Sequence, residues 1–345
     1  MTRKQSWGKE ILVKLVILTV TLLSGLLPAP GCSKRPGITP VADTHPEFPA
    51  ARFLRAEGSG STTIDARRQA LAELSSVFES RVVSQTTSLA KSSLGPDNAE
   101  LFEKKIESRI NIISSVRLEG ARIGKTWLDE ATGDFHALAV LDRVDAGKTW
   151  NNDLESLDNR LRAEVTALET AEGRLPRMAS LNRIMSLCLD RNIIESRLMV
   201  VDYPALSEQD LDLAKLTSEL AVIQSKFRFY VDVKGEYGQT AGKILSQTLT
   251  RNGIFITPIK DKADAWITGQ VEITPLNLDN TKISFVRATG DVQVIETGTH
   301  ALFAEINETI RKGHLDRDEA IHKAVTAVSR QMSDRLAAAL GLSEK

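Results

Sequence analysis

Apolar residues along the chain follow two periods, and each change of period marks a predicted element. The stretch from Arg52 to Glu57 alternates with the two-residue period of a strand, and the glycine-serine run 58–61 ends it. From Thr62 the period becomes helical, and apolar positions three, four or seven residues apart predict a buried helix face: Ile64, Leu71, Leu74, Phe78 and Val82. Thr62, with Asp65 three residues later, is a helix cap. The folded body therefore begins with strand, glycine turn and helix.

A second helix and a hairpin complete this first module. A helical period extends over about 97–112, and strand-like stretches follow at 116–129 and 134–143. The residues between these strands, Glu130-Ala131-Thr132-Gly133, favour a chain reversal. We predict an α/β domain over residues 51–145 with the order β-α-α-β-β.

The middle of the chain, residues 146–226, is predicted to be helical. One helix runs over 145–171, Gly173 allows a reversal into a second helix, and a third helix with a capping box extends over 207–226. The first of these helices carries a narrow apolar seam: Leu154, Leu157, Leu161, Val165 and Leu168. The seam either packs within the chain, which we prefer, or pairs with another protein or subunit.

Five strands and two helices are predicted for the C-terminal domain, residues 227–345. The strands cover 227–234, 253–258, 266–275, 282–297 and 300–307, and the helices cover 239–251 and 316–340. Most connections are short, which favours antiparallel pairing. The predicted fold class is α+β: two small α/β sandwich modules, each an antiparallel sheet with helices, joined by a helical hairpin.

The N-terminus has the pattern of an export signal. Four basic residues lie within the first 14 positions, and the stretch from Leu15 to Leu27 has no charge. Thirteen residues are too few to span a bilayer, which takes about 20 apolar residues. We therefore predict a signal peptide over residues 1–31.

Cys32 follows this segment directly. A small residue, Gly31, before a cysteine resembles the bacterial lipobox, which implies that Cys32 is lipidated and becomes the mature N-terminus. Pro28 and Pro30 depart from the motif, which prefers Leu, Ala or Ser there, so an ordinary signal peptide or an uncleaved anchor is the alternative. Four prolines in the stretch 32–50 predict an extended tether. The second cysteine, Cys188, lies in an apolar helical stretch and is predicted to be buried and inert.

Composition narrows the function classes. The chain has 345 residues, 42% of them apolar, and its 44 Lys and Arg nearly balance its 45 Asp and Glu. It lacks the basic excess that draws proteins to nucleic acid. With 10 Phe, 4 Trp and 3 Tyr, it is also poor in the aromatic side chains that stack on bases. We therefore predict no nucleic-acid partner.

The first module resembles a known family. The strand ending Ala56-Glu57-Gly58-Ser59-Gly60, the alanine-spaced helix from Asp65 to Leu74, and the strand Phe135-His136-Ala137-Leu138-Ala139-Val140 look like the LPP-twenty lipoproteins, the twenty-kilodalton membrane-associated lipoprotein family. The resemblance implies a membrane lipoprotein without known enzymatic activity, some relatives of which serve in flagellar assembly. The C-terminal module is more loosely similar to curli-secretion-type lipoproteins and to the N-terminal domain of TolB-type translocation proteins.

Residues 120–126 resemble a phosphate-binding loop. Gly120 and Gly124, followed by Lys125 and Thr126, are separated by three residues where the nucleotide-binding pattern needs four. The stretch also continues a predicted strand instead of opening a helix. We therefore predict no nucleotide site, and Gly147-Lys148-Thr149, which has no upstream glycine, is expected to begin the helical hairpin.

Two further groups of residues are candidate ligand sites. The glycine run 58–61 precedes a helix and could hold an anion, but a tight turn with a helix cap is the simpler interpretation. Acidic and histidine side chains gather near the last helix: His314, Asp316, Asp318, Glu319 and His322. Asp316 and Glu319 also fit a capping box, so we predict no metal, no cofactor and no catalytic residues.

Together these observations predict a non-enzymatic bacterial lipoprotein, anchored through Cys32 at the periplasmic face of the outer membrane. In many Gram-negative lipoproteins an Asp after the lipidated cysteine favours the inner membrane, so the resemblance to a lipobox, with Ser33 at that place, implies the outer membrane. The protein would act through contacts with envelope proteins in an envelope or surface-structure assembly. This could be a flagellar assembly, in which some relatives serve. The protein could also form homo-oligomers. The alternative is a periplasmic binding module for a small ligand or peptidoglycan, and an enzyme of another type comes third.

Overall fold

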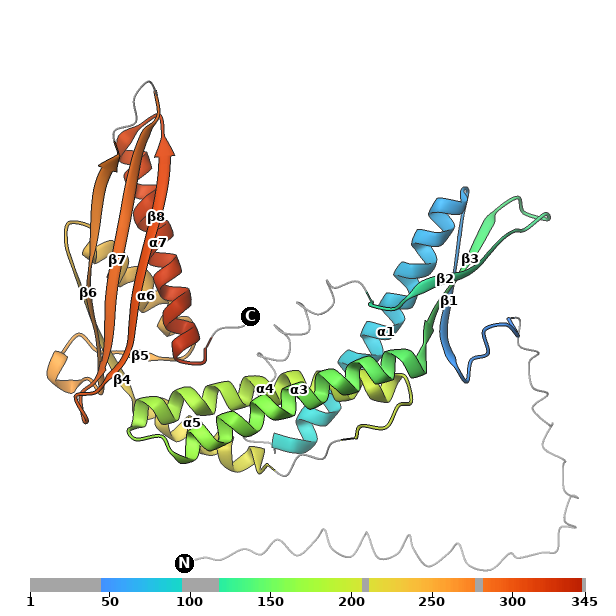
Figure 1. Ribbon diagram of the computed structural model, residues 1–345, viewed down its shortest axis with the longest axis horizontal. Helices are drawn as coiled ribbons and strands as arrows, with labels where there is room; N and C mark the ends of the chain where they lie inside the picture. Colours follow the sequence, from blue (N-terminus) through green and yellow to red (C-terminus); the bar gives the residue numbers. More distant parts are fainter. Residues whose placement is uncertain (1–44, 95–117, 207–210, 277–281, 343–345) are drawn as a thin grey trace, which may run out of the picture. The chain divides into compact units, whose positions relative to one another are not determined.

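The computed structural model describes residues 45–94, 118–206, 211–276 and 282–342. Three predicted features lie outside the described residues: the signal peptide 1–31 with Cys32, most of the tether, and the helix over 97–112. The described part has the predicted α+β fold class, with a three-stranded and a five-stranded sheet (Figure 1).

The first sheet is antiparallel and has the order β1-β3-β2. Strand β1 (Phe53–Gly60) leads into helix α1 (Thr63–Leu94), and β2 (Arg122–Leu128) and β3 (Phe135–Asp142) form the predicted hairpin. Gly133, with φ of +78°, takes the left-handed conformation in the turn between them. The Asp129 carbonyl accepts from the Gly133 amide at 2.7 Å, which closes the turn.

Glycines 58 and 60 allow close packing, and the turn conformation expected for the run is absent. Strand β1 continues through both residues, and neither has a positive φ. A Cβ on Gly58 would lie 2.1 Å from the backbone nitrogen of Ala70, on α1. The glycines are therefore needed because α1 folds back directly onto β1. The predicted cap is confirmed, since the Asp65 amide donates to Thr62 Oγ1 at 3.1 Å.

The buried face of α1 differs from the prediction at its start. Ile64 is 72% exposed, whereas Ala66 and Ala70 are fully buried. The glycines of β1 bring the backbone of α1 very close, and the small residues Ala66 and Ala70 form the contact. Further along, where the helix leaves the strand, the predicted Leu74, Phe78 and Val82 are buried.

Helices α3 (Arg143–Glu169) and α4 (Arg174–Val200) form the predicted hairpin. They lie side by side in Figure 1, and the leucine seam of α3 is buried in the main core, with Val165 packed against it. The preferred interpretation, packing within the chain, is confirmed. Cys188 on α4 is buried, as predicted.

Helix α5 (Leu213–Lys226) begins later than predicted. Its cap is Asp212, whose side chain accepts from the Lys215 amide at 2.9 Å. The proposed capping box, Ser207 with Asp210, lies outside the described residues. A prediction from short-range spacing could not separate two acidic residues that both precede an apolar helix.

The second sheet has the order β5-β4-β6-β7-β8. Its elements are β4 (Arg228–Lys234), α6 (Gly238–Arg251), β5 (Phe255–Ile256), a 3₁₀ turn (Lys260–Lys262), β6 (Ala265–Leu276), β7 (Ser284–Glu296), β8 (Leu302–His314) and α7 (Arg317–Ala339).

The prediction of a purely antiparallel second sheet is wrong at β4, which forms two parallel pairings. β4 pairs in parallel with both β5 and β6, whereas β6, β7 and β8 form an antiparallel meander. The reason is α6, because a helix between two strands returns the chain to the same end of the sheet. The sheet is therefore mixed.

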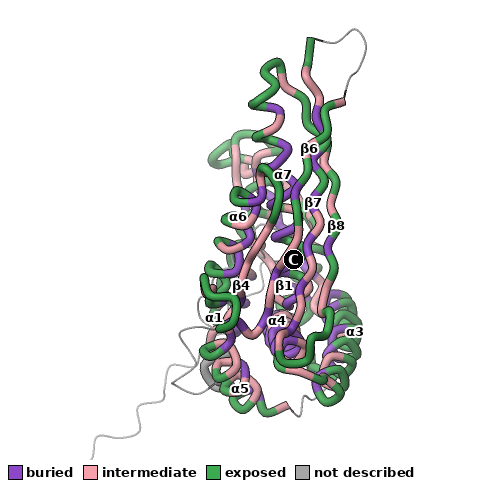
Figure 2. Tube along the Cα trace, turned by 90° about the vertical axis from the view of Figure 1, so that its left-hand side faces the viewer, coloured by how far each residue is buried: buried purple, intermediate pink, exposed green. Residues whose placement is uncertain are grey.

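One face of this sheet carries α6 and α7 (Figure 1). Buried and less buried positions alternate along β7, as Figure 2 shows, and the buried ones include Val286, Ala288, Val292 and Val294. They belong to the same core as the apolar face of α7, on which Val325, Val328, Met332 and Leu336 are buried and Ile321 is half-buried. Leu340, which directly follows the helix, is buried too.

The start of α4 is fixed to the end of β7. Glu296, 5% exposed, accepts hydrogen bonds through Oε1 from the amides of Arg174 at 2.6 Å and Leu175 at 3.0 Å. Arg174 also pairs with Asp264 at 2.7 Å. Gly173 precedes this contact with φ of +101°, and a Cβ there would lie 2.1 Å from Glu296 Oε2. A carboxylate of the sheet thus caps a helix far away in sequence.

Candidate functional site

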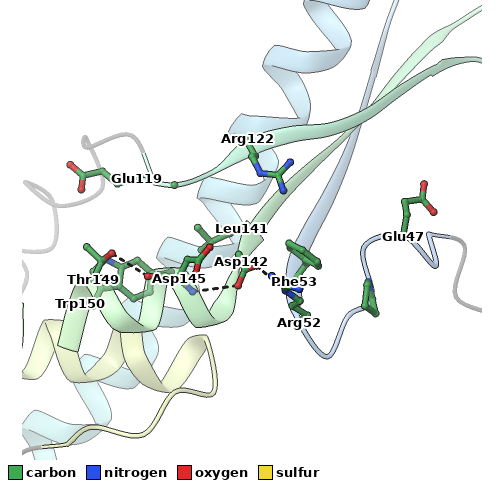
Figure 3. A pocket seen from close by; sticks show the side chains of 13 residues that line it. Glu47, Arg52, Phe53, Glu119, Arg122, Leu141, Asp142, Asp145, Thr149 and Trp150 are labelled. Atoms are coloured by element: carbon green, nitrogen blue, oxygen red, sulfur yellow. Dashed lines mark hydrogen bonds and ion pairs between the residues drawn. The ribbon is translucent and has the colours of Figure 1, made fainter. Parts of the chain in front are cut away.

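A cleft of about 620 Å³ lies where the first sheet meets the start of α3. It is lined by three stretches that are far apart in sequence, within 47–53, 119–122 and 141–150 (Figure 3). These stretches contribute the residues before and at the start of β1, the approach to β2, and the junction of β3 with α3. The fold, and not any local motif, assembles this cleft.

Pairing between β1 and β3 sets the geometry of the cleft. Phe53 is opposite Asp142 in the antiparallel register, and the Arg143 amide donates to the Arg52 carbonyl at 3.0 Å. The Arg143 side chain reaches the end of α4, where it pairs with Asp202 at 2.7 Å. The end of one strand, the beginning of another and the end of a helix are therefore held together.

Asp142 is the central polar residue. Its Oδ1 caps α3 by accepting from the amides of Val144 at 3.0 Å and Asp145 at 3.3 Å, and its Oδ2 accepts from Arg52 Nε at 2.9 Å. Burial works against ionisation of Asp142, but the hydrogen bonds from Arg52 and the two amides outweigh it, so its pKa lies below the ordinary value. Asp142 is therefore a charged structural cap.

The floor of the cleft is apolar and its rim is charged. Leu141, Phe53 and Trp150 are buried, and the Trp150 ring packs against Phe78 of α1 with centroids 5.4 Å apart. Around the rim lie exposed side chains of both signs: Glu47, Arg52, Glu119, Arg122 and Asp145. Such a rim suits a ligand or a protein loop that itself carries both charges.

Two rim residues, Glu47 and Arg122, differ in whether they already form an ion pair. Glu47 accepts from Lys125 Nζ at 3.0 Å, and its pKa is lowered by a hydrogen bond from its own backbone and then by Lys125. Arg122 extends from β2 toward the cleft in Figure 3 and has no carboxylate of the described residues within ion-pair distance. Arg122, whose guanidinium lies over the Phe48 ring at 5.8 Å from its centroid, is thus a rim cation that is not paired with a described carboxylate.

The residues that lead into β1 also fold onto the first sheet. His45 pairs with Glu57 at 2.9 Å, and Phe48 packs with Phe53, Leu138 and Val140 on the sheet face opposite α1. The last six residues of the predicted tether, 45–50, therefore lie against the sheet, and Glu47 and Pro49 line the cleft from there.

The candidate motifs of the sequence have structural roles. Lys125 lies on β2 and not at a helix start, so the stretch from Gly120 lacks the loop-to-helix geometry of a phosphate loop. Asp316 caps α7 by accepting from the Glu319 amide at 2.9 Å. Within the described ranges, no three His, Cys, Asp or Glu side chains gather as a metal site would require. Gly147 lets Tyr203 approach α3, since a Cβ there would lie 2.2 Å from its ring.

Sequence reasoning missed the cleft itself. Arg122, Leu141 and Trp150 carry no local motif, and they meet only through strand pairing and helix packing. Asp142 did carry a usable signal, because an aspartate between a strand pattern and a helix pattern is a typical N-cap.

Comparison with known proteins yields distant structural similarity only. No family model and no curated protein matches the chain. Among solved structures, the chain is similar to the rare lipoprotein B from Shewanella oneidensis, with 16% identity and a TM-score of 0.25, over 33% of this chain and 92% of that one. It is also similar to the secreted protein HP1454 from Helicobacter pylori, with 14% identity and a TM-score of 0.28, over 81% of this chain and 97% of that one.

A third similar structure is the PelC dodecamer from Paraburkholderia phytofirmans, with 14% identity and a TM-score of 0.24, over 33% of this chain and 87% of that one. The structural neighbours are thus bacterial lipoproteins and secreted proteins. The LPP-twenty resemblance of about residues 50–145 stays a prediction. Across the described residues, no helix has both the length and the apolar character needed to cross a membrane.

Proposed function

We propose that this protein is a non-enzymatic lipoprotein of the LPP-twenty type, anchored through Cys32 at the periplasmic face of the outer membrane. It acts through contacts with envelope proteins in an envelope or surface-structure assembly, such as a flagellar one. The observation that carries the proposal is Cys32 itself, placed directly after an export signal of 31 residues and before a proline-rich stretch.

The chemistry of the cleft supports a role in binding. Asp142 is used as a helix cap and as the partner of Arg52, and Glu47 is paired with Lys125. The cleft floor consists of packed core residues, among them Leu141 and Trp150. These groups hold the sheet and helix together, so a ligand or partner meets a preformed surface.

Fractionation of cells tests the anchor and its membrane. The wild-type chain is expected in outer-membrane fractions of a density gradient, and Cys32→Ala in the soluble or inner-membrane fractions. A matched control is Ser33→Ala, which keeps the cysteine and should leave membrane association intact. A Cys32→Ala chain that still sediments with the outer membrane would contradict the proposal. Cross-linking of intact envelopes, read by mass spectrometry, then identifies the contacting proteins.

A periplasmic binding module is the second candidate, and Arg122 favours it. An exposed guanidinium beside an apolar floor and acidic rim residues suits peptides that carry both amines and carboxylates, including the stem peptides of peptidoglycan. The test is co-sedimentation of the full chain with purified peptidoglycan. Binding that Arg122→Ala reduces at least about tenfold, while Arg330→Ala on α7 does not, would favour this candidate. Equal sedimentation of the two variants would exclude the cleft as the binding site.

A further inference from the structure

The five-stranded sheet ends on β8, a strand of 13 residues. It pairs with β7 on one side, and no other described strand pairs with it on the opposite side. About half of the N–H and C=O groups of such an edge strand point away from the sheet. From Ala304 to His314 the pairing with β7 has no register shift that would bend the edge away. Long, regular edges of this kind template pairing with another chain.

The charges along β8 are complementary to a second copy of β8. Glu305 lies in the first half of the strand and Arg311 in the second, and both are exposed. They are six residues apart, so both project from the same face. When two copies pair antiparallel about Glu308, the regular positions 304–312 are matched one to one, and Glu305 of each copy lies opposite Arg311 of the other. This register thus forms two opposite-charge pairs.

The environment of Glu308, the middle residue, is compatible with this pairing. Glu308 would meet its own copy at the two-fold axis, and two carboxylates placed there would repel each other if they were bare. Each Glu308 already accepts from Arg335 Nε at 3.1 Å and from Gln331, both on α7. Its side chain is 11% exposed. Each Glu308 carboxylate therefore keeps its own ion pair with Arg335 when the two copies meet.

We propose that β8 is the interface of an isologous dimer, in which β8 of a second copy of this chain pairs antiparallel about Glu308 and extends the sheet across both copies. This inference goes beyond the proposed function and does not rest on it. The two are tested separately, because membrane anchoring depends on Cys32 and pairing depends on β8.

Charge exchange tests the interface. The full chain, extracted in detergent, is measured by size-exclusion chromatography with light scattering, and the wild type should be a dimer. Glu305→Arg and Arg311→Glu should each raise the dissociation constant by about tenfold or more, because both symmetry-related pairs become repulsive. The double variant Glu305→Arg/Arg311→Glu should dimerise again. A wild type that is monomeric, or a dimer that none of the three variants changes, would overturn the proposal.

A disulfide test fixes the register and does not depend on the charge variants. Asn307 and Thr309 are exposed and lie opposite each other across the proposed axis. Two differently tagged chains, one Asn307→Cys and one Thr309→Cys, should form a mixed disulfide under mild oxidation when they are produced together. Two Asn307→Cys chains should form far less, and the parent chain gives the background from its own cysteines. Equal yields for the mixed and the identical pair, or none above background, would overturn the register.

Discussion

Replacing Gly58 by alanine should destabilise the first module, because α1 packs directly on this strand position. The added Cβ would lie 2.1 Å from the Ala70 nitrogen and 2.7 Å from the Ala70 Cα. Both are backbone atoms, so no rotamer change relieves the contact. Ordinary contact begins at 3.4 Å, which means that the helix must retreat by more than about 1 Å.

The retreat has a cost that can be estimated from the neighbours. Ala66 and Ala70 are fully buried and Leu74 is 2% exposed, so moving α1 away loosens a packed layer along three turns. Overpacking of a core typically costs 1–3 kcal/mol and sometimes more, and we expect about 3 kcal/mol here because backbone must move. The urea midpoint of unfolding should fall by about 1 M or more.

Urea unfolding followed by circular dichroism measures this loss, with Gly298→Ala as the matched control. A Cβ on Gly298 has no neighbouring atom within 4 Å, and its φ is not positive. The control should stay within about 0.5 kcal/mol of the wild type. Equal midpoints for Gly58→Ala and Gly298→Ala would refute the reasoning that close helix packing selects the glycine.

Three further predictions concern buried and capping groups. Arg191→Ala should cost about 3–5 kcal/mol in urea unfolding, because it leaves the buried carboxylate of Asp158, 2.8 Å away, without its cation; a loss below about 1 kcal/mol would contradict this. Asp142 has a lowered pKa in the folded state, so its charge stabilises the fold above the unfolded pKa of about 4 and this contribution is lost as pH falls through the folded value. The stability advantage of the wild type over Asp142→Asn should therefore shrink from pH 7 toward pH 3, and a pH-independent difference would exclude the mechanism. Gly173→Ala should lower stability by about 2–4 kcal/mol, since it strains a positive φ and displaces the Glu296 cap of α4; an unchanged midpoint would show that the cap yields without cost.

Local pattern was sufficient for elements whose partners are adjacent in sequence. The β2–β3 hairpin, the α3–α4 hairpin and the meander β6–β7–β8 follow from periodicity and turn residues, because each packs mainly against its neighbour along the chain. The capping by Thr62 and Asp316 was equally readable, since a cap depends on residues three positions apart.

Contacts between segments that are distant in sequence could not be predicted from the hydrophobic pattern. The hydrophobic period placed Ile64 in the core, but the contact with a glycine strand selects Ala66 and Ala70 instead. The cleft residues Arg122 and Trp150 come from different elements, and neither local sequence indicates that they line the same cleft. The Glu296 cap likewise joins the end of a strand to a helix more than a hundred residues earlier.

Metabolic labelling with an acyl-chain analogue tests the central claim most directly. The wild-type chain, produced in a Gram-negative host, should incorporate the label, and Cys32→Ala should not. Because Cys188 is buried and stays in the variant, it provides an internal control for labelling of other thiols. Label on the wild type alone is the predicted result, whereas equal label on the Cys32→Ala chain, or an unlabelled wild type, would contradict the lipoprotein account.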